Sequence, residues 1–219
     1  MKIRALILFI TCFSLVVFHV SCSRKRSIHR KGRLIWRSRV LTWTFRDPQR
    51  LVHNTAHSKA IRDVTRKVFK KWAAILRGRL LFVEVAEDDL DQVEENIMDK
   101  RGRNYRKPWW VDIDIVFARG DHGDGEAFDG PGGTVAHSAY PPLGIVHLDA
   151  DELWTLRENG NRVNLETVLL HEIGHVLGLH HLKDPDSIMN VYYRNLRHGA
   201  TLSKVDEKAI RKLYHLTNK

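Results

Sequence analysis

The sequence predicts an α+β domain with five short strands and three helices, and two kinds of pattern support this class. Several short stretches alternate bulky residues with polar or hydroxyl ones, as half-buried strands do. Longer stretches repeat apolar residues at helical spacing. With 219 residues, of which 43% are hydrophobic, the chain is long enough for one ordinary domain with a real core and attachments.

The elements follow from these patterns in chain order. The five predicted strands are residues 40–45, 80–85, 111–117, 134–140 and 144–149. The first helix, residues 58–76, repeats apolar residues on one face and carries most of its basic residues elsewhere, so we expect it to pack on a sheet. The second begins at Asn164 or Leu165. The third begins at Ser203, which forms a capping-box pattern with Asp206.

The second helix carries the main chemical motif, residues 171–181. His171 and His175 are four apart and therefore share one helical face, with Glu172 beside them. Gly178 can end the helix in a left-handed conformation, which brings His181 back as a third ligand. Three histidines leave the fourth position of a tetrahedral zinc open for water, as in catalytic sites. The neighbouring His180 is out of register with this motif, so we expect it at the surface or next to the ligands.

The net charge of the chain indicates which classes of binding partner to expect. The formal net charge is +10, and much of the excess lies in residues 24–50 and 62–79. A basic surface favours anionic partners such as sulfated glycans, anionic membranes or nucleic acid, and the simplest alternative is a solvated positive face. Because a nucleic-acid role rests on charge alone, we expect no nucleic-acid partner, and we expect a monomer.

The N-terminal region resembles an export signal. Lys2 and Arg4 precede an apolar run ending at Val20, and small residues follow, so residues 1–22 predict a cleaved secretory signal. Because the flank after this run is more basic than the one before it, an uncleaved membrane anchor is the alternative. Residues 23–39 form a basic linker, and residues 40–219 form the domain, with a charged insertion at about 86–108. Cys12 and Cys22 are the only cysteines, so no disulfide framework stabilises the domain.

Met189 lies eight residues after His181. A long histidine motif followed by a methionine turn resembles the metzincin clan of zinc endopeptidases. Residues 119–124, 128–137 and 147–152 narrow the likeness, because they closely resemble the catalytic domain of the matrix metalloproteinases, or matrixins. The resemblance runs from about Leu41 to Leu216. It implies a five-stranded, mixed and twisted sheet with three helices, the active-site helix being followed by the methionine turn.

The same resemblance implies further sites. A structural zinc would be held by His122, Asp124, His137 and His147, a closed four-coordinate set. At least one calcium would be bound by the carboxylates of Asp129, Asp149 and Glu152 and the carbonyls of Gly130, Gly132 and Thr134, since calcium prefers oxygen ligands. Substrate contacts would come from Val135 and Ala136 on the strand to which an extended substrate pairs, from Thr167 and from Tyr193.

Some features depart from the family pattern. Val191 stands where relatives usually have Pro, and Leu182 where a Ser commonly follows the third histidine. Cys22 lies in no context that matches the family's zinc-capping propeptide cysteine, so we do not expect latency by that route.

The sequence therefore predicts a secreted endopeptidase with two zinc ions and calcium that cleaves extracellular or matrix proteins. In this prediction His171, His175 and His181 bind the catalytic zinc, and Glu172 accepts a proton from the attacking water and delivers it to the leaving amine. The alternative is a noncatalytic, metal-stabilised basic module that binds sulfated glycans.

Overall fold

The computed structural model describes residues 19–23, 34–47, 51–52, 55–85, 107–157, 162–192 and 200–216, with the backbone alone for 19–23 and Thr55. Most of the predicted signal, linker and charged insertion lies outside these residues, and so does Tyr193. Within the described chain, no helix is long and apolar enough to cross a membrane.

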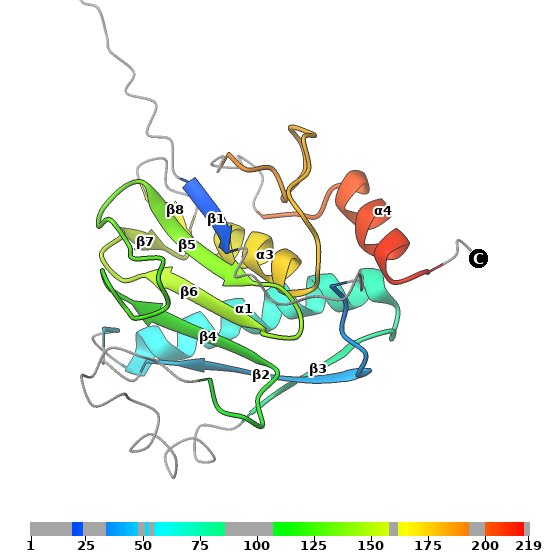
Figure 1. Cartoon of the computed structure of the whole chain (residues 1–219), viewed down its shortest axis with the longest axis horizontal. Helices are drawn as coiled ribbons and strands as arrows, with labels where there is room; N and C mark the ends of the chain where they lie inside the picture. Colours follow the sequence, from blue (N-terminus) through cyan, green and yellow to red (C-terminus); the bar gives the residue numbers. More distant parts are fainter. Residues whose placement is uncertain are drawn as a thin grey trace, which may run out of the picture.

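One mixed sheet forms the centre of the domain (Figure 1). Its strands are β1 (His19–Ser23), β2 (Val40–Arg46), β3 (Leu81–Glu84), β4 (Ile113–Ala118), β5 (Thr134–Ala139) and β6 (Ile145–Asp149). Their spatial order is β1-β5-β6-β4-β2-β3. Strands β3, β2, β4 and β6 are mutually parallel, and β5 runs antiparallel to β6. The five predicted strands, β2 to β6, are confirmed as one mixed sheet.

A sixth strand, β1, borders β5. It pairs with β5 in parallel, with His19 opposite Thr134 and Ser23 opposite Ala139. The sequence assigns residues 19–22 to the export signal and predicts no strand there, because this apolar run lacks the alternation of a half-buried strand. Figure 1 shows β1 lying along the open side of β5. The edge of β5 that faces away from β6 is therefore covered in this structure.

Two helices pack on one face of this sheet. Helix α1 (Thr55–Leu76) begins three residues before the predicted start and crosses behind β2 and β4 (Figure 1). Trp43 of β2 stacks on Phe69 of α1 with ring centroids 4.9 Å apart. Trp72 of α1 is fully buried, and its indole N–H donates to the Leu170 carbonyl at 3.2 Å. The apolar face of α1 thus holds both the sheet and the next helix, α3.

The remaining elements confirm the predicted helix ends. Helix α3 (Leu165–Val176) is capped by Asn164, whose side chain accepts from the Thr167 N–H at 3.0 Å. Gly178, just after the helix, has φ +102°, the left-handed conformation that the motif required. Helix α4 (Lys204–Leu213) begins with the capping box of Ser203 and Asp206. Strands β7 (Trp154–Thr155) and β8 (Val163–Asn164) form a small parallel pair that the sequence did not predict.

Candidate metal centres and active site

Helix α3 and the turn after it bring three imidazoles to one point. His171 and His175 lie one turn apart on α3, and their Nε2 atoms are 3.0 Å apart. The left-handed turn at Gly178 returns the chain, so that the Nε2 of His181 lies 3.1 Å from that of His175. The ligand atoms of the three residues lie within 4.8 Å of one another. The predicted ligand set is therefore brought together.

The hydrogen bonds of these rings show which nitrogens face the centre. The Nδ1 of His171 lies 2.7 Å from the Ile188 carbonyl, and the Nδ1 of His175 lies 2.7 Å from the Leu179 carbonyl. A carbonyl only accepts, so each Nδ1 carries the proton and each Nε2 presents a lone pair when the ring is neutral. Burial holds the pKa of His171 at about 4 and that of His175 well below its usual value. Two lone pairs 3.0 Å apart repel each other, and a bound cation removes that repulsion. The donor set therefore fits zinc.

Glu172 lies beside this cluster and is fully buried. Neither carboxylate oxygen has a hydrogen-bond partner of good geometry among the described residues, although the nearby Ser138 hydroxyl acts to lower its pKa. Burial dominates and raises the pKa of Glu172 to about 8. A cation held by the neighbouring histidines would favour the ionised form, which is the form a proton acceptor needs.

Met189 lies in the turn that packs against α3. The residue is fully buried, and the turn that carries it is closed by the Asn190 N–H donating to the Ser187 carbonyl at 3.1 Å. A Cβ on Gly174 would lie 2.3 Å from the Met189 sulfur and 3.1 Å from a ring carbon of Trp72, so the glycine leaves room for both side chains to pack against α3. The predicted methionine turn is thus present and packed directly against the motif helix.

Asp206 is the main residue near the site whose part could not be predicted from the sequence. It is fully buried; one carboxylate oxygen accepts from the Ser187 hydroxyl at 2.5 Å, and the other accepts from the Ile188 N–H at 3.0 Å. The Ile188 carbonyl in turn accepts from His171. The capping-box pattern had marked Asp206 as a helix cap, and no local signal could show that the same carboxylate reaches the methionine turn.

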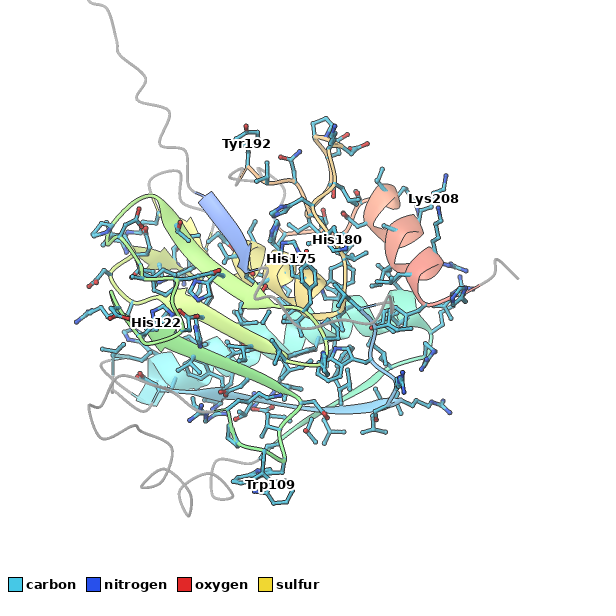
Figure 2. The ribbon with its side chains drawn as sticks, viewed as in Figure 1. Trp109, His122, His175, His180, Tyr192 and Lys208 are labelled. Carbon is cyan, nitrogen blue, oxygen red and sulfur yellow. The ribbon has the colours of Figure 1, made fainter. Side chains whose placement is uncertain are left out.

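A second histidine cluster forms on β5, β6 and the loop after β4. His137 of β5 and His147 of β6 are cross-strand neighbours, and the loop after β4 adds His122 and Asp124. The Nε2 of His137 lies 3.1 Å from the Nδ1 of His147, 3.3 Å from the Nε2 of His122 and 2.9 Å from an Asp124 oxygen. Figure 2 shows His122 well separated from His175.

The electrostatics of this second cluster also suit a cation. The Nδ1 of His122 donates to the Gly120 carbonyl at 2.9 Å, so its Nε2 is the ligand atom. Burial lowers the pKa of His147 to about 4, which keeps that ring neutral. Although burial opposes it, hydrogen bonding from the three histidines holds the pKa of Asp124 far below its usual range. A set of three imidazoles and one carboxylate fits a closed zinc site.

The three acids predicted to bind calcium lie near one another around the Gly-rich loop. Asp149 is fully buried, with one carboxylate oxygen lacking a hydrogen-bond partner in the described chain. Burial raises the pKa of Asp149 and Glu152, and the negative charge of Asp129 raises both further. Their oxygens do not gather within 4.8 Å as the zinc ligands do. Glu152 instead accepts from the Gly132 N–H at 2.6 Å, and Asp129 accepts from the Thr134 N–H at 3.2 Å.

The predicted substrate-contacting residues have different placements. Val135 and Ala136 are buried on β5. Thr167 is buried in the first turn of α3, where its hydroxyl lies 3.3 Å from the Asn164 side chain, so it takes part in capping the helix. His180, expected at the surface or beside the ligands, is exposed, and its Nδ1 lies 2.7 Å from the hydroxyl of Tyr140, which directly follows β5.

Comparison with known proteins agrees with this geometry. The sequence model of the matrixin family matches residues 35–215. Human matrix metalloproteinase-16 is 34% identical over 184 residues, which are 82% of this chain and 27% of the relative. Matrilysin of Rattus norvegicus is 43% identical over 122 residues, 53% of this chain and 45% of that protein. Macrophage metalloelastase of Rattus norvegicus is 49% identical over 108 residues, 48% and 23% respectively.

The matched region thus spans from about a quarter to a little under half of the length of these relatives. Residues 35–215, which the family model matches, include both histidine clusters, the buried glutamate and the methionine turn. The chain belongs to the matrixin family of peptidases.

Proposed function

We propose that this chain is a secreted zinc-dependent endopeptidase that cleaves extracellular or matrix proteins. The observation that carries the proposal is the convergence of the His171, His175 and His181 Nε2 atoms beside the fully buried carboxylate of Glu172. A purely structural zinc site is closed by a fourth protein ligand, whereas this set holds three. The second cluster, with four ligands, would hold the structural zinc.

The roles of the residues follow from their places. A zinc ion held by the three histidines would polarise a water molecule and lower its pKa. Glu172 would take a proton from that water and pass it to the leaving amine, because it is the acid next to the ligands in a site shielded from bulk water. The carbonyls of Ile188 and Leu179 fix the tautomers of His171 and His175, so that both rings present Nε2. Met189 packs against the helix that carries two of the ligands, at Gly174.

Calcium binding by Asp129, Asp149 and Glu152 is part of the proposal. The buried Asp149 oxygen that has no partner in the described chain, and the raised pKa values of Asp149 and Glu152, support a cation at this loop. Small rotations of the Asp129 and Glu152 side chains, which now bind backbone N–H groups, would be needed to complete the oxygen set.

The edge of β5 that faces away from β6 is proposed as the edge to which an extended substrate pairs, by adding a strand to the sheet. In this structure β1 occupies that edge. A substrate must therefore replace β1, and the predicted export cleavage after residue 22 would remove four of its five residues. Sequencing the N-terminus of the secreted protein tests this step directly. A mature protein that retains residues 19–23 would contradict it.

Substitution of Glu172 tests the mechanism. Glu172→Gln keeps the shape of the side chain but removes the proton acceptor, so we expect cleavage of a peptide library to fall by about 10² to 10⁴-fold. Zinc content should stay the same, which separates a chemical effect from loss of metal. Full activity in this variant, or wild-type activity that survives a zinc chelator, would rule the mechanism out.

A further inference from the structure

The structure distinguishes between the basic surfaces of this chain. The basic stretch at residues 62–79 belongs mostly to α1, and four of its seven cations are paired with acids. Arg66 pairs with Asp63 and Glu84, and Lys67 and Lys71 both contact Glu166, at 2.7 and 2.5 Å. Arg62 lies 3.5 Å from Glu84. These ion pairs remove much of the positive field that the sequence suggested for this helix.

Helix α4, in contrast, has exposed cations without acidic partners in the described chain. Its exposed face borders a shallow groove of about 440 Å³, lined by Lys204, Glu207, Lys208, Arg211, Lys212 and Leu216. Four cations and one acid thus line one groove. Glu207 lies 3.5 Å from Lys204, while Lys208 and Lys212 are exposed and form no ion pair in the described chain. The buried side of the same helix carries Asp206, Ile210 and Tyr214.

The helix itself does not account for this arrangement. Cations near the C-terminal end of a helix are favoured by its dipole, which explains Arg211 and Lys212. Lys204 is the first helical residue, where the dipole disfavours a positive charge, and Lys208 lies in the middle. The four cations also follow one stripe, spaced by four, three and one residues, which spans about 12 Å along the axis.

We infer that the groove on α4 is a binding site for sulfated glycan chains, separate from the catalytic centre. A linear polyanion matches a stripe of flexible ammonium and guanidinium groups, because each contact releases counterions from the chain. Figure 2 shows Lys208 extending into solvent from the side of α4 that faces away from His175. A glycan bound there leaves the histidine cluster uncovered, and it can hold the peptidase near substrates in a sulfated matrix.

Two other kinds of polyanion fit less well. A groove for single-stranded nucleic acid would offer aromatic side chains for base stacking, and no aromatic residue lines this one. A membrane-binding helix would present a broad apolar face, whereas Leu216 is the one apolar residue of the lining. The choice of sulfated glycans rests on the extracellular location proposed above, so the experiment must separate glycan binding from peptidase function.

The test compares two matched pairs of substitutions on an immobilised heparin column. The variant Lys208→Gln with Lys212→Gln removes two charges from the groove. The control Lys59→Gln with Lys70→Gln removes two exposed charges from α1 that form no ion pair in the described chain. We expect the α4 variant to bind heparin about tenfold or more weakly at physiological salt, and the slope of log affinity against log salt to fall by about two. In the α1 control, the heparin affinity and the salt slope should change far less.

Further measurements test whether the loss of heparin binding comes from the charges of the α4 groove. Lys208→Arg with Lys212→Arg should keep heparin affinity, and all variants should cleave a short peptide at the wild-type rate. Equal loss of affinity in the α4 and α1 pairs would mean nonspecific attraction and would overturn the assignment. So would binding of anionic phospholipid vesicles that is as strong as heparin binding and is lost in the same α4 variant. If the wild-type protein binds heparin but cleaves no peptide, the peptidase proposal is rejected and the glycan-binding site is not.

Discussion

Asp206 shows how one residue outside the metal cluster can set the geometry of a ligand. Its carboxylate accepts from the Ser187 hydroxyl and the Ile188 N–H, and the Ile188 carbonyl accepts from the His171 Nδ1. The same carboxylate caps α4 through the Ser203 N–H at 2.8 Å. A buried charge is tolerated here because four hydrogen bonds surround it. The outer partners of a metal ligand commonly fix its orientation and basicity.

Substitution of Asp206 should therefore weaken zinc binding at the histidine cluster. Asp206→Asn keeps the side-chain volume but replaces one acceptor oxygen with an NH₂ donor. This donor would face either the Ile188 N–H or the Ser187 hydroxyl, and one of these two hydrogen bonds would be lost. We expect about tenfold weaker zinc affinity, measured by competition with a chelator. Ser203→Ala is the matched control, since it removes a capping contact and leaves the methionine turn intact. An equal loss of zinc affinity in the control would show that Asp206 acts only through the stability of α4.

At the scale of elements, the C-terminal end of α3 is held by side chains from elsewhere in the chain. The last carbonyls of a helix lack partners within it. The Tyr214 hydroxyl donates to the Leu177 carbonyl at 2.9 Å, and the Trp36 indole N–H donates to the Val176 carbonyl at 2.8 Å. Tyr214 directly follows α4 as its C-cap, and Trp36 lies in the segment before β2. These two residues therefore fix the point at which the chain turns toward His181.

The buried phenol of Tyr214 predicts a loss of stability in base. Burial raises its pKa to about 12, against about 10 in the unfolded chain. As pH rises, the unfolded state therefore releases the phenol proton before the folded state does. The contribution of this group to the free energy of unfolding is intact below about pH 10 and is lost as pH rises from about 10 to about 12. We expect a loss of about 2 kcal/mol from this group, measured by urea unfolding across that range. Tyr214→Phe should be less stable at pH 8 but lack this part of the pH dependence. Identical slopes in the two proteins would contradict the prediction.

At the scale of the whole molecule, the two histidine clusters join different parts of the fold. His171, His175 and His181 fasten α3 to the segment after it, whereas His122, Asp124, His137 and His147 fasten the loop after β4 to β5 and β6. Because no disulfide framework is available, we expect metal binding to supply a large part of the stability. A ligand present at a thousand times its dissociation constant adds about 4 kcal/mol.

Metal removal should therefore lower the thermal stability, and each cluster should contribute separately. We expect a chelator to reduce Tm by about 10 °C or more, measured by calorimetry. Metal analysis should find two zinc ions in the wild type, with His147→Ala and His175→Ala each losing one. His175→Ala should abolish peptide cleavage, whereas His147→Ala should mainly lower Tm. Two zinc ions retained in His147→Ala would contradict the assignment of the second site.

The helix caps, the five core strands and the metal motif could be predicted because each depends on residues close together in the sequence. Ser203 and Asp206 form the predicted capping box, and Gly178 takes the left-handed conformation that its motif required. Strand β1 could not be predicted in this way, since its pairing with β5 joins residues more than a hundred positions apart. The charged insertion and Tyr193 lie outside the described residues, so those predictions stand as made.

The sequence by itself determined the ligand types and their local spacing, because the 3.6-residue period of a helix places His171 and His175 on one face. Only the tertiary structure decided which distant groups complete that arrangement. It brought Asp206 to the methionine turn, covered the edge of β5 with β1, and paired four cations of α1 with acids while leaving Lys208 and Lys212 of α4 unpaired in the described chain. Charge composition is a sum over residues, whereas a binding surface depends on which charges the fold brings within reach of each other.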